Sequence, residues 1–332
     1  MTGRPRPATS RPSPCNAKNC TVAHLQVGRV VFWMTGALLS FSASALAIRA
    51  LGNDLNIFEI LTIRSGGGLI ILLALLAARP ELRHEISPRF MGFHLARNTT
   101  HFIGQYCWSL AVTLLPFATV FSLEFTMPAW VALLAVFILG ERMTTSRLGT
   151  VVLGFLGVLV IVRPGLAGFK PQALLVLFAA FAYAISLIVT KQLTNRVSTY
   201  TIVFWMTLIQ LPLGLAWPSA VAASGGPPLF VFRMGTELVL PAIVLGVVGL
   251  SSHYFLTQAF RCGDATVVVP LDFLRIPLIA VVGWMFYGET VDVFVFIGAG
   301  LIICGVLWNL LAESKRSRAP AAAAQQAQAA ET

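Results

Sequence analysis

Apolar and polar positions of this chain are segregated into long blocks, in which extended apolar runs alternate with short stretches that carry the charges. A helix of about 20 apolar residues spans the hydrocarbon core of a bilayer, since each residue adds about 1.5 Å. Ten such runs are present, and we expect each to cross the membrane. They cover residues 30–48, 58–78, 90–115, 117–139, 148–162, 172–190, 200–216, 238–260, 265–287 and 293–311. The pattern predicts an all-α membrane protein.

Part of this pattern occurs twice in the chain. Residues 105–160 align without a gap to residues 253–308, 148 positions later. The alignment pairs Glu124 with Asp272 inside an apolar run and ends that run with Gly-Glu in both copies, at 140–141 and 288–289. Shared polar positions of this kind rarely arise by chance between apolar segments, so we infer a duplication.

The duplication divides the chain into two sets of five helices, residues 28–165 and 166–312. The first helix of each set also ends alike, with Ile48-Arg49 answered by Thr190-Lys191. An odd number of crossings per set makes the two repeats inverted relative to each other. Residues 1–27 and 313–332 are expected to be disordered cytoplasmic tails, because they lack long apolar runs.

Charged residues give the expected orientation. If the N-terminus is cytoplasmic, sixteen of the 23 Lys and Arg residues fall on the cytoplasmic side, and only Arg49, Arg163, Lys170 and Arg233 fall on the other. The positive-inside rule then places both termini in the cytoplasm.

Composition excludes several other classes. The chain is 57% apolar and 11% charged, whereas soluble domains are about half apolar and a quarter charged. The formal charge of +10 is spread over loops and tails, so a nucleic-acid partner is not expected. The five cysteines show no metal-ligand spacing; we expect no metal site, no disulfide framework and no cofactor.

Five ionisable side chains fall inside the predicted membrane segments: Arg64, Arg97, Glu124, Asp272 and Arg275. Each costs at least about 2.5 kcal/mol at the centre of a membrane helix, so each needs a partner or water. From the midpoints of their helices, the two carboxylates are expected to straddle the membrane centre, roughly 12 Å apart in depth.

Two interpretations of these charges remain open. Arg97 could pair with Glu124 and Arg275 with Asp272 as purely structural ion pairs. Alternatively, the pairs open, so that a carboxylate takes a proton or a substrate amine and a guanidinium takes a substrate carboxylate. Pro128 supports a functional role, since it cannot donate to the carbonyl of Glu124 and should kink the helix there.

The helix of residues 90–115 carries a polar stripe at spacings of three to four, which should face a cavity or a neighbouring helix. Its repeat equivalent, residues 238–260, is polar at matching positions. The candidate binding residues of these two helices are Arg97, His101, Gln105, Tyr106, His253 and Tyr254. For His101, an interhelical hydrogen bond is the alternative to a proton relay. The tryptophans Trp108, Trp130, Trp205 and Trp284 are interpreted as packing residues or interface anchors, with a substrate cage as the alternative.

Two further features concern the ends and surfaces of helices. Glu141 and Glu289 are expected to fold loops, by capping the next helix or by pairing with a nearby base. Glycines on the helices of residues 148–162 and 293–311 predict close helix packing, with homodimerisation through the same surface as an alternative. These glycines are Gly154, Gly157, Gly298, Gly300 and Gly305.

With these residues placed, the chain resembles the drug/metabolite transporter superfamily, of the ten-helix type with two EamA domains. The resemblance covers about residues 29–312 and is carried by four groups of residues: Arg97-Asn98, the run 114–128, the Gly-Glu pairs, and the segments 154–157 and 263–275. It implies a bacterial inner-membrane carrier with a central cavity lined chiefly by the helices of residues 90–115, 117–139, 238–260 and 265–287. The acidic pair Glu124 and Asp272 is not shared by all members, so the resemblance implies no particular coupling ion.

Residues and resemblance together predict a secondary active transporter that moves a small polar or zwitterionic organic metabolite by alternating access, as proton-coupled efflux. Its partners would be the substrate, membrane lipids and protons. Uptake by the same fold is one alternative. A membrane-embedded enzyme acting on a lipid or peptide is another, but the sequence lacks His-Glu-x-x-His and a recognisable nucleophile set against a His. We therefore expect no enzymatic activity.

Overall fold

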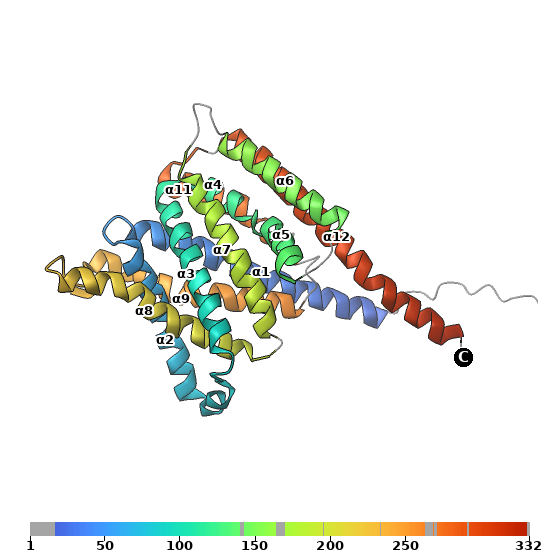
Figure 1. Ribbon diagram of the computed structural model, residues 1–332, viewed down its shortest axis with the longest axis horizontal. Helices are drawn as coiled ribbons and strands as arrows, with labels where there is room; N and C mark the ends of the chain where they lie inside the picture. Colours follow the sequence, from blue (N-terminus) through green and yellow to red (C-terminus); the bar gives the residue numbers. More distant parts are fainter. Residues whose placement is uncertain are drawn as a thin grey trace, which may run out of the picture.

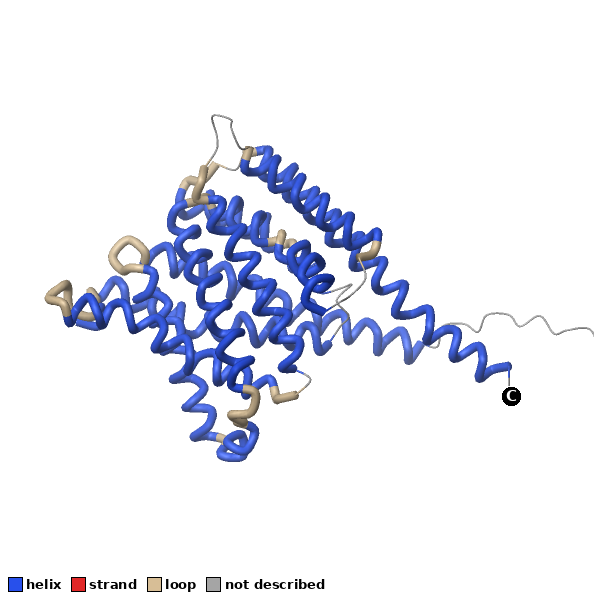
Figure 2. The backbone as a smooth tube through the Cα atoms, viewed as in Figure 1, coloured by secondary structure: helices blue, strands red, loops and turns tan. Residues whose placement is uncertain are grey.

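The computed structural model describes residues 17–139, 143–163, 170–194, 196–232, 234–262, 268, 271–290 and 292–330. Over these ranges every regular element is helical (Figure 2), which confirms the all-α fold. Eight candidate membrane spans meet the length and composition of a bilayer crossing. They are α1 (Ala17–Leu51), α2 (Ile57–Ala78), α4 with α5 (Phe117–Glu124 and Met127–Leu139), α6 (Thr145–Val162), α7 (Ala173–Thr194), α8 (Thr199–Ala223), α9 (Thr236–Cys262) and α12 (Val293–Ala330).

The described parts of the two remaining predicted crossings contain helices that differ from the others. Helix α3 (Met91–Leu114) carries the polar stripe, and α11 (Arg275–Tyr287) is short. Short 3-10 helices, η1 (Pro80–Glu85) and η2 (Phe230–Phe232), lie in the connections.

Helices pair across the two halves of the chain. The main pairs are α1 with α9, α3 with α7, α2 with α8, and α6 with α12. The first helices of the two repeats are α1 and α7, and the third helices are α3 and α9, so the pair α1–α9 is equivalent to the pair α7–α3. The other two pairs each join two equivalent helices, as a twofold pseudosymmetry requires. Figure 1 shows α6 and α12 side by side along one flank of the bundle.

Glycines allow the closest of these approaches. A Cβ atom on Gly157 would lie 2.6 Å from the carbonyl oxygen of Gly298, so α6 and α12 meet through their backbones. This contact confirms the close-packing interpretation of those glycines. A second contact joins α2 to α9, where a Cβ atom on Gly67 would lie 2.5 Å from the Cα of Gly246. In lipid such contacts hold helices together, because no hydrophobic effect operates between them.

The fourth predicted crossing is broken in the middle. Helix α4 ends at Glu124 and α5 begins at Met127, where the sequence predicted a kink. The turn that precedes α11, at residues 273–274, lies 148 positions after the turn at 125–126. A proline follows each turn: Pro128 cannot donate to the carbonyl of Glu124, nor Pro277 to that of Phe273. Both repeats therefore interrupt a helix beside their carboxylate.

The ends of the chain differ from the expectation of disordered tails. Helix α1 already begins at Ala17, inside the predicted tail 1–27, and α12 continues to Ala330, through the predicted tail 313–332. Each extension continues a formed helix, so no nucleation is required, and the Ala-rich composition of the C-terminal segment favours helix. Residues 1–16 and 331–332 lie outside the described residues.

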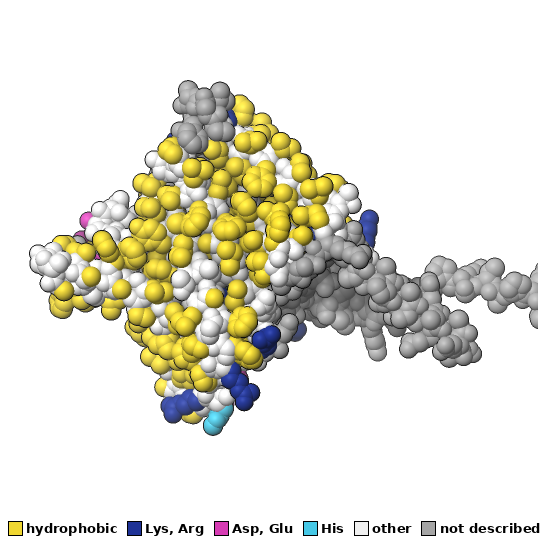
Figure 3. Space-filling model, in the orientation of Figure 1, with side chains coloured by type: hydrophobic (Ala, Val, Ile, Leu, Met, Phe, Trp, Pro, Cys, Tyr) yellow, Lys and Arg dark blue, Asp and Glu magenta, His cyan; other side chains and the backbone are white. Residues whose placement is uncertain are grey.

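The outer surface of the bundle is apolar, as contact with lipid requires. Large side chains such as Phe137, Leu240 and Trp284 are exposed on it. In the view of Figure 3, hydrophobic side chains cover most of the face, and Lys and Arg side chains gather toward its lower edge.

Candidate functional site

The turns in the two broken crossings bring three charged side chains together. Arg275, the first residue of α11, donates from Nη2 to Asp272 Oδ2 at 2.7 Å and from Nη1 to Glu124 Oε1 at 3.5 Å. Trp108 of α3 donates from Nε1 to the other carboxylate oxygen of Glu124 at 2.8 Å. One guanidinium thus serves both carboxylates, and we call Glu124, Asp272 and Arg275 the acid cluster.

This geometry corrects two expectations. The predicted pair Arg275–Asp272 is present, but Arg97 does not pair with Glu124; its place is taken by Arg275 from the other repeat. The expected separation of roughly 12 Å in depth is also wrong, because a single guanidinium reaches both carboxylates. The estimate placed each residue on a straight helix, whereas both helices turn at this level.

Aromatic rings enclose the acid cluster. The guanidinium carbon of Arg275 lies 4.5 Å from the ring centre of Phe41 and 5.1 Å from that of Phe125. Such rings attract a cation and exclude water from it. Asp272 Oδ1 and Arg275 Nε are buried, and neither has a hydrogen-bond partner among the described residues. The cluster thus retains an acceptor that a proton or a ligand donor could satisfy.

A second polar group lies on α2, α3 and α9. Arg97 donates from Nε to Thr190 Oγ1 at 3.1 Å and from Nη1 to Asn98 Oδ1 at 2.7 Å. Arg64 Nη2 lies 3.3 Å from the carbonyl oxygen of Gly249 and 3.3 Å from His253 Nε2. We call Arg64, Arg97, His101 and His253 the basic cluster.

Hydrogen bonds and ring contacts link this group to its neighbours. The amide nitrogen of Gln210 lies 3.0 Å from His101 Nδ1, and the hydroxyl of Tyr183 donates to Gln105 Oε1 at 3.3 Å. The rings of His101 and His253 are 6.0 Å apart between centres. His101, Gln105 and His253, predicted from the polar stripes, therefore meet in one network.

Two predicted residues do not join it. Tyr254 is 55% exposed, and its hydroxyl accepts from Gln258 on the same helix face. Tyr106 packs its ring against Phe58, with 4.7 Å between centres, beside the hydrophobic core. Both follow a stripe residue by one position, which turns their side chains about 100° away from the stripe.

The structure adds residues that the sequence analysis did not place in the site. Arg64 was identified only as a charge in the membrane, and Trp108 only as a packing residue. Phe41 and Tyr183 were not singled out. The matched ends of the first and sixth crossings were a signal from which Phe41 and Tyr183 could have been identified. Arg49 and Lys191 are 142 positions apart, as are Phe41 and Tyr183, and each aromatic ring lies against a central histidine.

A contact between the two repeats lies at one end of the bundle. Arg49, near the end of α1, forms an ion pair with Glu289, which lies after α11, and donates to the carbonyls of Val112 and Leu115 at the end of α3. Glu289 also accepts from the backbone nitrogen of Phe117 at 2.9 Å. It was expected to pair with a base or to cap the next helix. It does pair with a base, Arg49, and the helix start that it caps is that of α4, not of the next helix. Glu141, its repeat equivalent, lies outside the described residues.

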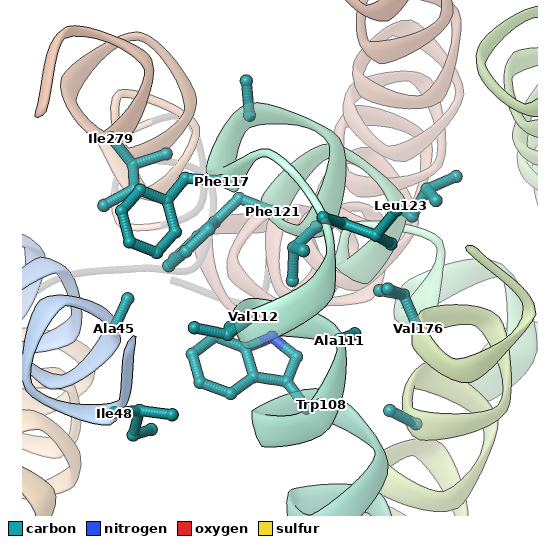
Figure 4. Packing of buried hydrophobic residues seen from close by; sticks show 14 of the residues in the cluster. Ala45, Ile48, Trp108, Ala111, Val112, Phe117, Phe121, Leu123, Val176 and Ile279 are labelled. Atoms are coloured by element: carbon teal, nitrogen blue, oxygen red, sulfur yellow. The ribbon is translucent and has the colours of Figure 1, made fainter. Parts of the chain in front are cut away.

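A dense apolar layer lies beneath this contact. Ala45, Ile48, Phe117, Phe121 and Ile279 are fully buried there and come from three different helices (Figure 4). Arg163 and Asp292 form an ion pair, so the end of α6 and the start of α12 lie at the same end of the bundle. The contact between Arg49, Glu289 and Phe117 joins α1 and the start of α4 to the end of α11, and we call it the latch.

Loss of the latch should loosen this end. We expect Glu289→Ala to raise the rate at which a maleimide modifies Ala45→Cys, in protein lacking the native cysteines, by at least about tenfold, which corresponds to about 1.4 kcal/mol. The control is the same reporter with Glu289 intact. Equal rates in the two proteins would show that the latch does not limit access.

Comparison with known proteins places the chain beside transporters. The model of a family described as "EamA-like transporter family" matches residues 28–163 and 170–311. A riboflavin transporter of Rhizobium johnstonii is 30% identical over 69% of this chain and 73% of its own length. An S-adenosylmethionine uptake transporter of Rickettsia felis is 28% identical, over 85% and 92%.

Two further matches complete the comparison. A pseudopaline exporter of Pseudomonas aeruginosa is 29% identical over 80% of this chain and 90% of its own length. A solved structure, titled only as the crystal structure of a protein, superposes with a TM-score of 0.56 at 20% identity and covers 86% of this chain and 98% of its own. This last likeness concerns the fold alone.

Proposed function

Because the chain belongs to the EamA-like transporter family, we propose that it is a secondary active transporter that moves a small polar or zwitterionic organic metabolite by alternating access, as proton-coupled efflux. We place it in the bacterial inner membrane with both termini in the cytoplasm. The transport names of its relatives point away from an enzyme.

The acid cluster carries the proposal. Two carboxylates share one guanidinium at the break of two symmetry-related crossings, and Asp272 Oδ1 has no hydrogen-bond partner among the described residues. The cluster therefore has one negative charge more than Arg275 can neutralise. In a low-dielectric interior an uncompensated charge is costly. A proton, or the ammonium group of a substrate, would remove that cost.

Sharing of Arg275 also suggests how binding and conformation are coupled. Glu124 ends α4 in the first repeat, and Asp272 precedes α11 in the second, so the guanidinium joins parts that move relative to each other in alternating access. Protonation of either carboxylate would release one arm of this bridge. Proton binding would then favour a different arrangement of the repeats.

Relatives divide on the direction of transport. The name of the pseudopaline exporter supports efflux. The S-adenosylmethionine transporter is named for uptake, and the name of the riboflavin transporter gives no direction. Uptake is therefore the second candidate. An imposed pH gradient across the membrane distinguishes the two, since efflux by exchange with protons requires protons to enter as the substrate leaves.

Reconstituted vesicles with an imposed pH gradient test the coupling. With riboflavin and S-adenosylmethionine as first substrates, we expect Glu124→Gln and Asp272→Asn to remove the dependence of transport on the gradient and to lower the rate at least about tenfold. Glu81→Gln, a matched change at an exposed position of η1, should leave both unchanged. Folded variants that keep the wild-type rate and pH dependence would refute a coupling role.

A further inference from the structure

Among the residues that the structure describes, no acid forms an ion pair with the basic cluster. Arg64 and Arg97 are each 8% exposed, and none of the ion pairs among the described residues includes either of them. Their partners are neutral: hydroxyl, amide, imidazole and carbonyl groups. The two positive charges also act on each other and on His101. Uncompensated ions inside a membrane protein are expected to have a function.

Arg64 has spare hydrogen-bonding capacity. Its buried Nε has no hydrogen-bond partner in the described part of the chain, and its two contacts from Nη2 are both 3.3 Å long. Charge-assisted hydrogen bonds are normally about 2.7–2.9 Å, so neither contact satisfies the guanidinium well. Gly249 leaves room for this side chain, because a Cβ atom at that position would lie 2.8 Å from Arg64 Cγ.

A small cavity touches this guanidinium. It has a volume of about 10 Å³ and is lined by Arg64, Gly68, Thr207, Gln210 and Gly249, among others, from α2, α8 and α9. A space of that size holds about one water molecule. Because its walls come from three helices, a relative movement of the repeats would change its size.

Both central histidines can add donors. An arginine can only donate, so His253 Nε2 accepts from Arg64 and the proton of the neutral ring is on Nδ1. The amide nitrogen of Gln210 likewise donates to His101 Nδ1, which places that proton on Nε2. Each ring therefore keeps one N–H that is not used in these contacts.

We propose that the basic cluster, with Arg64 at its centre, binds an anionic group of the transported metabolite, either a carboxylate or a phosphate. This inference rests on the proposed transport function and specifies its substrate class. The ring of Phe41 lies between the two clusters, 4.5 Å from the Arg275 guanidinium carbon and 6.0 Å from the centre of the His253 ring. A metabolite with both charges would place its cationic group at the acid cluster and its anionic group at the basic cluster.

Binding of small anions to the purified full-length protein tests this assignment. Thermal unfolding is followed in detergent with acetate, phosphate or acetamide, at constant ionic strength set with sodium chloride. We expect acetate or phosphate to raise the apparent Tm of the wild type, and acetamide not to do so, because a ligand that binds the folded state stabilises it. The anion whose stabilising effect depends on Arg64 identifies the group.

Arg64→Gln is compared with Arg79→Gln, the same change at an exposed position just after α2. Phosphate stabilises many proteins without binding, so the difference between variants is the measured quantity. We expect Arg64→Gln to weaken the apparent affinity at least about tenfold, and Arg79→Gln to match the wild type. Equal responses of both variants, or an equal effect of acetamide, would overturn the proposal.

If Arg64→Gln does not fold, two other measurements still test whether the basic cluster binds an anion. Arg64→Lys keeps the charge without the planar fork and should bind with intermediate affinity. In the wild type, the bound anion should slow modification of His101 and His253 by diethyl pyrocarbonate but not that of exposed His84; no protection would count against the site. Neither measurement uses a gradient. If the Glu124 and Asp272 variants kept the wild-type pH dependence, which would refute the coupling role, this result would still stand, and the reverse also holds.

Discussion

Arg275→Gln is expected to abolish transport and to lower the free energy of unfolding by about 3–5 kcal/mol, because it leaves two buried carboxylates without their shared cation. The side chains concerned are only 6%, 20% and 16% exposed, in the order Arg275, Glu124 and Asp272, so solvent screens them weakly. Denaturant unfolding in detergent and flux into vesicles measure the two effects.

A neutral triple variant separates charge from packing. Arg275→Gln combined with Glu124→Gln and Asp272→Asn removes all three charges, so most of the lost stability should return while transport stays absent. This follows because replacing a whole buried ion pair by neutral groups costs far less than removing one partner. A triple variant as unstable as Arg275→Gln alone would show that the shape of the arginine, not its charge, holds the turn.

Adjacent glycines of α2 should respond in opposite ways. In Gly67→Ala the new Cβ atom would lie 2.5 Å from the Cα of Gly246, so α2 and α9 must move apart. We expect a loss of stability of about 1–3 kcal/mol or more and, since Arg64 and Gly249 lie on the same two helices, weaker transport. The apparent Tm and the flux in vesicles measure both.

Gly66→Ala is the matched control. There the nearest atom to the new Cβ is Leu211 Cδ1 at 3.7 Å, an ordinary contact. Alanine favours helix over glycine by up to about 1 kcal/mol, so this variant should be as stable as the wild type or more stable. Equal destabilisation by the two substitutions would indicate that the backbone of α2, rather than its contact with α9, needs glycine.

Local sequence predicted those parts of the site that lie close together in the chain. Asp272 and Arg275 are three positions apart, and their pairing could be predicted from that spacing. The break beside Glu124 could be predicted from Pro128. The Arg97–Glu124 pair failed because nothing in either segment fixes how α3 and α4 are rotated about their axes. In the structure Trp108 of α3, rather than Arg97, faces Glu124.

By itself the sequence determined a bundle of apolar helices in two related halves, since run length, repeated polar positions and prolines act locally along the chain. Tertiary structure alone decided which partner each charge meets. Arg275 meets Glu124, Arg49 meets Glu289, and Arg64 meets the carbonyl of Gly249 on α9. These partners are 151, 240 and 185 positions apart. The contacts between helix backbones at glycines such as Gly67 and Gly246, and the direction in which each broken helix turns, bring them together.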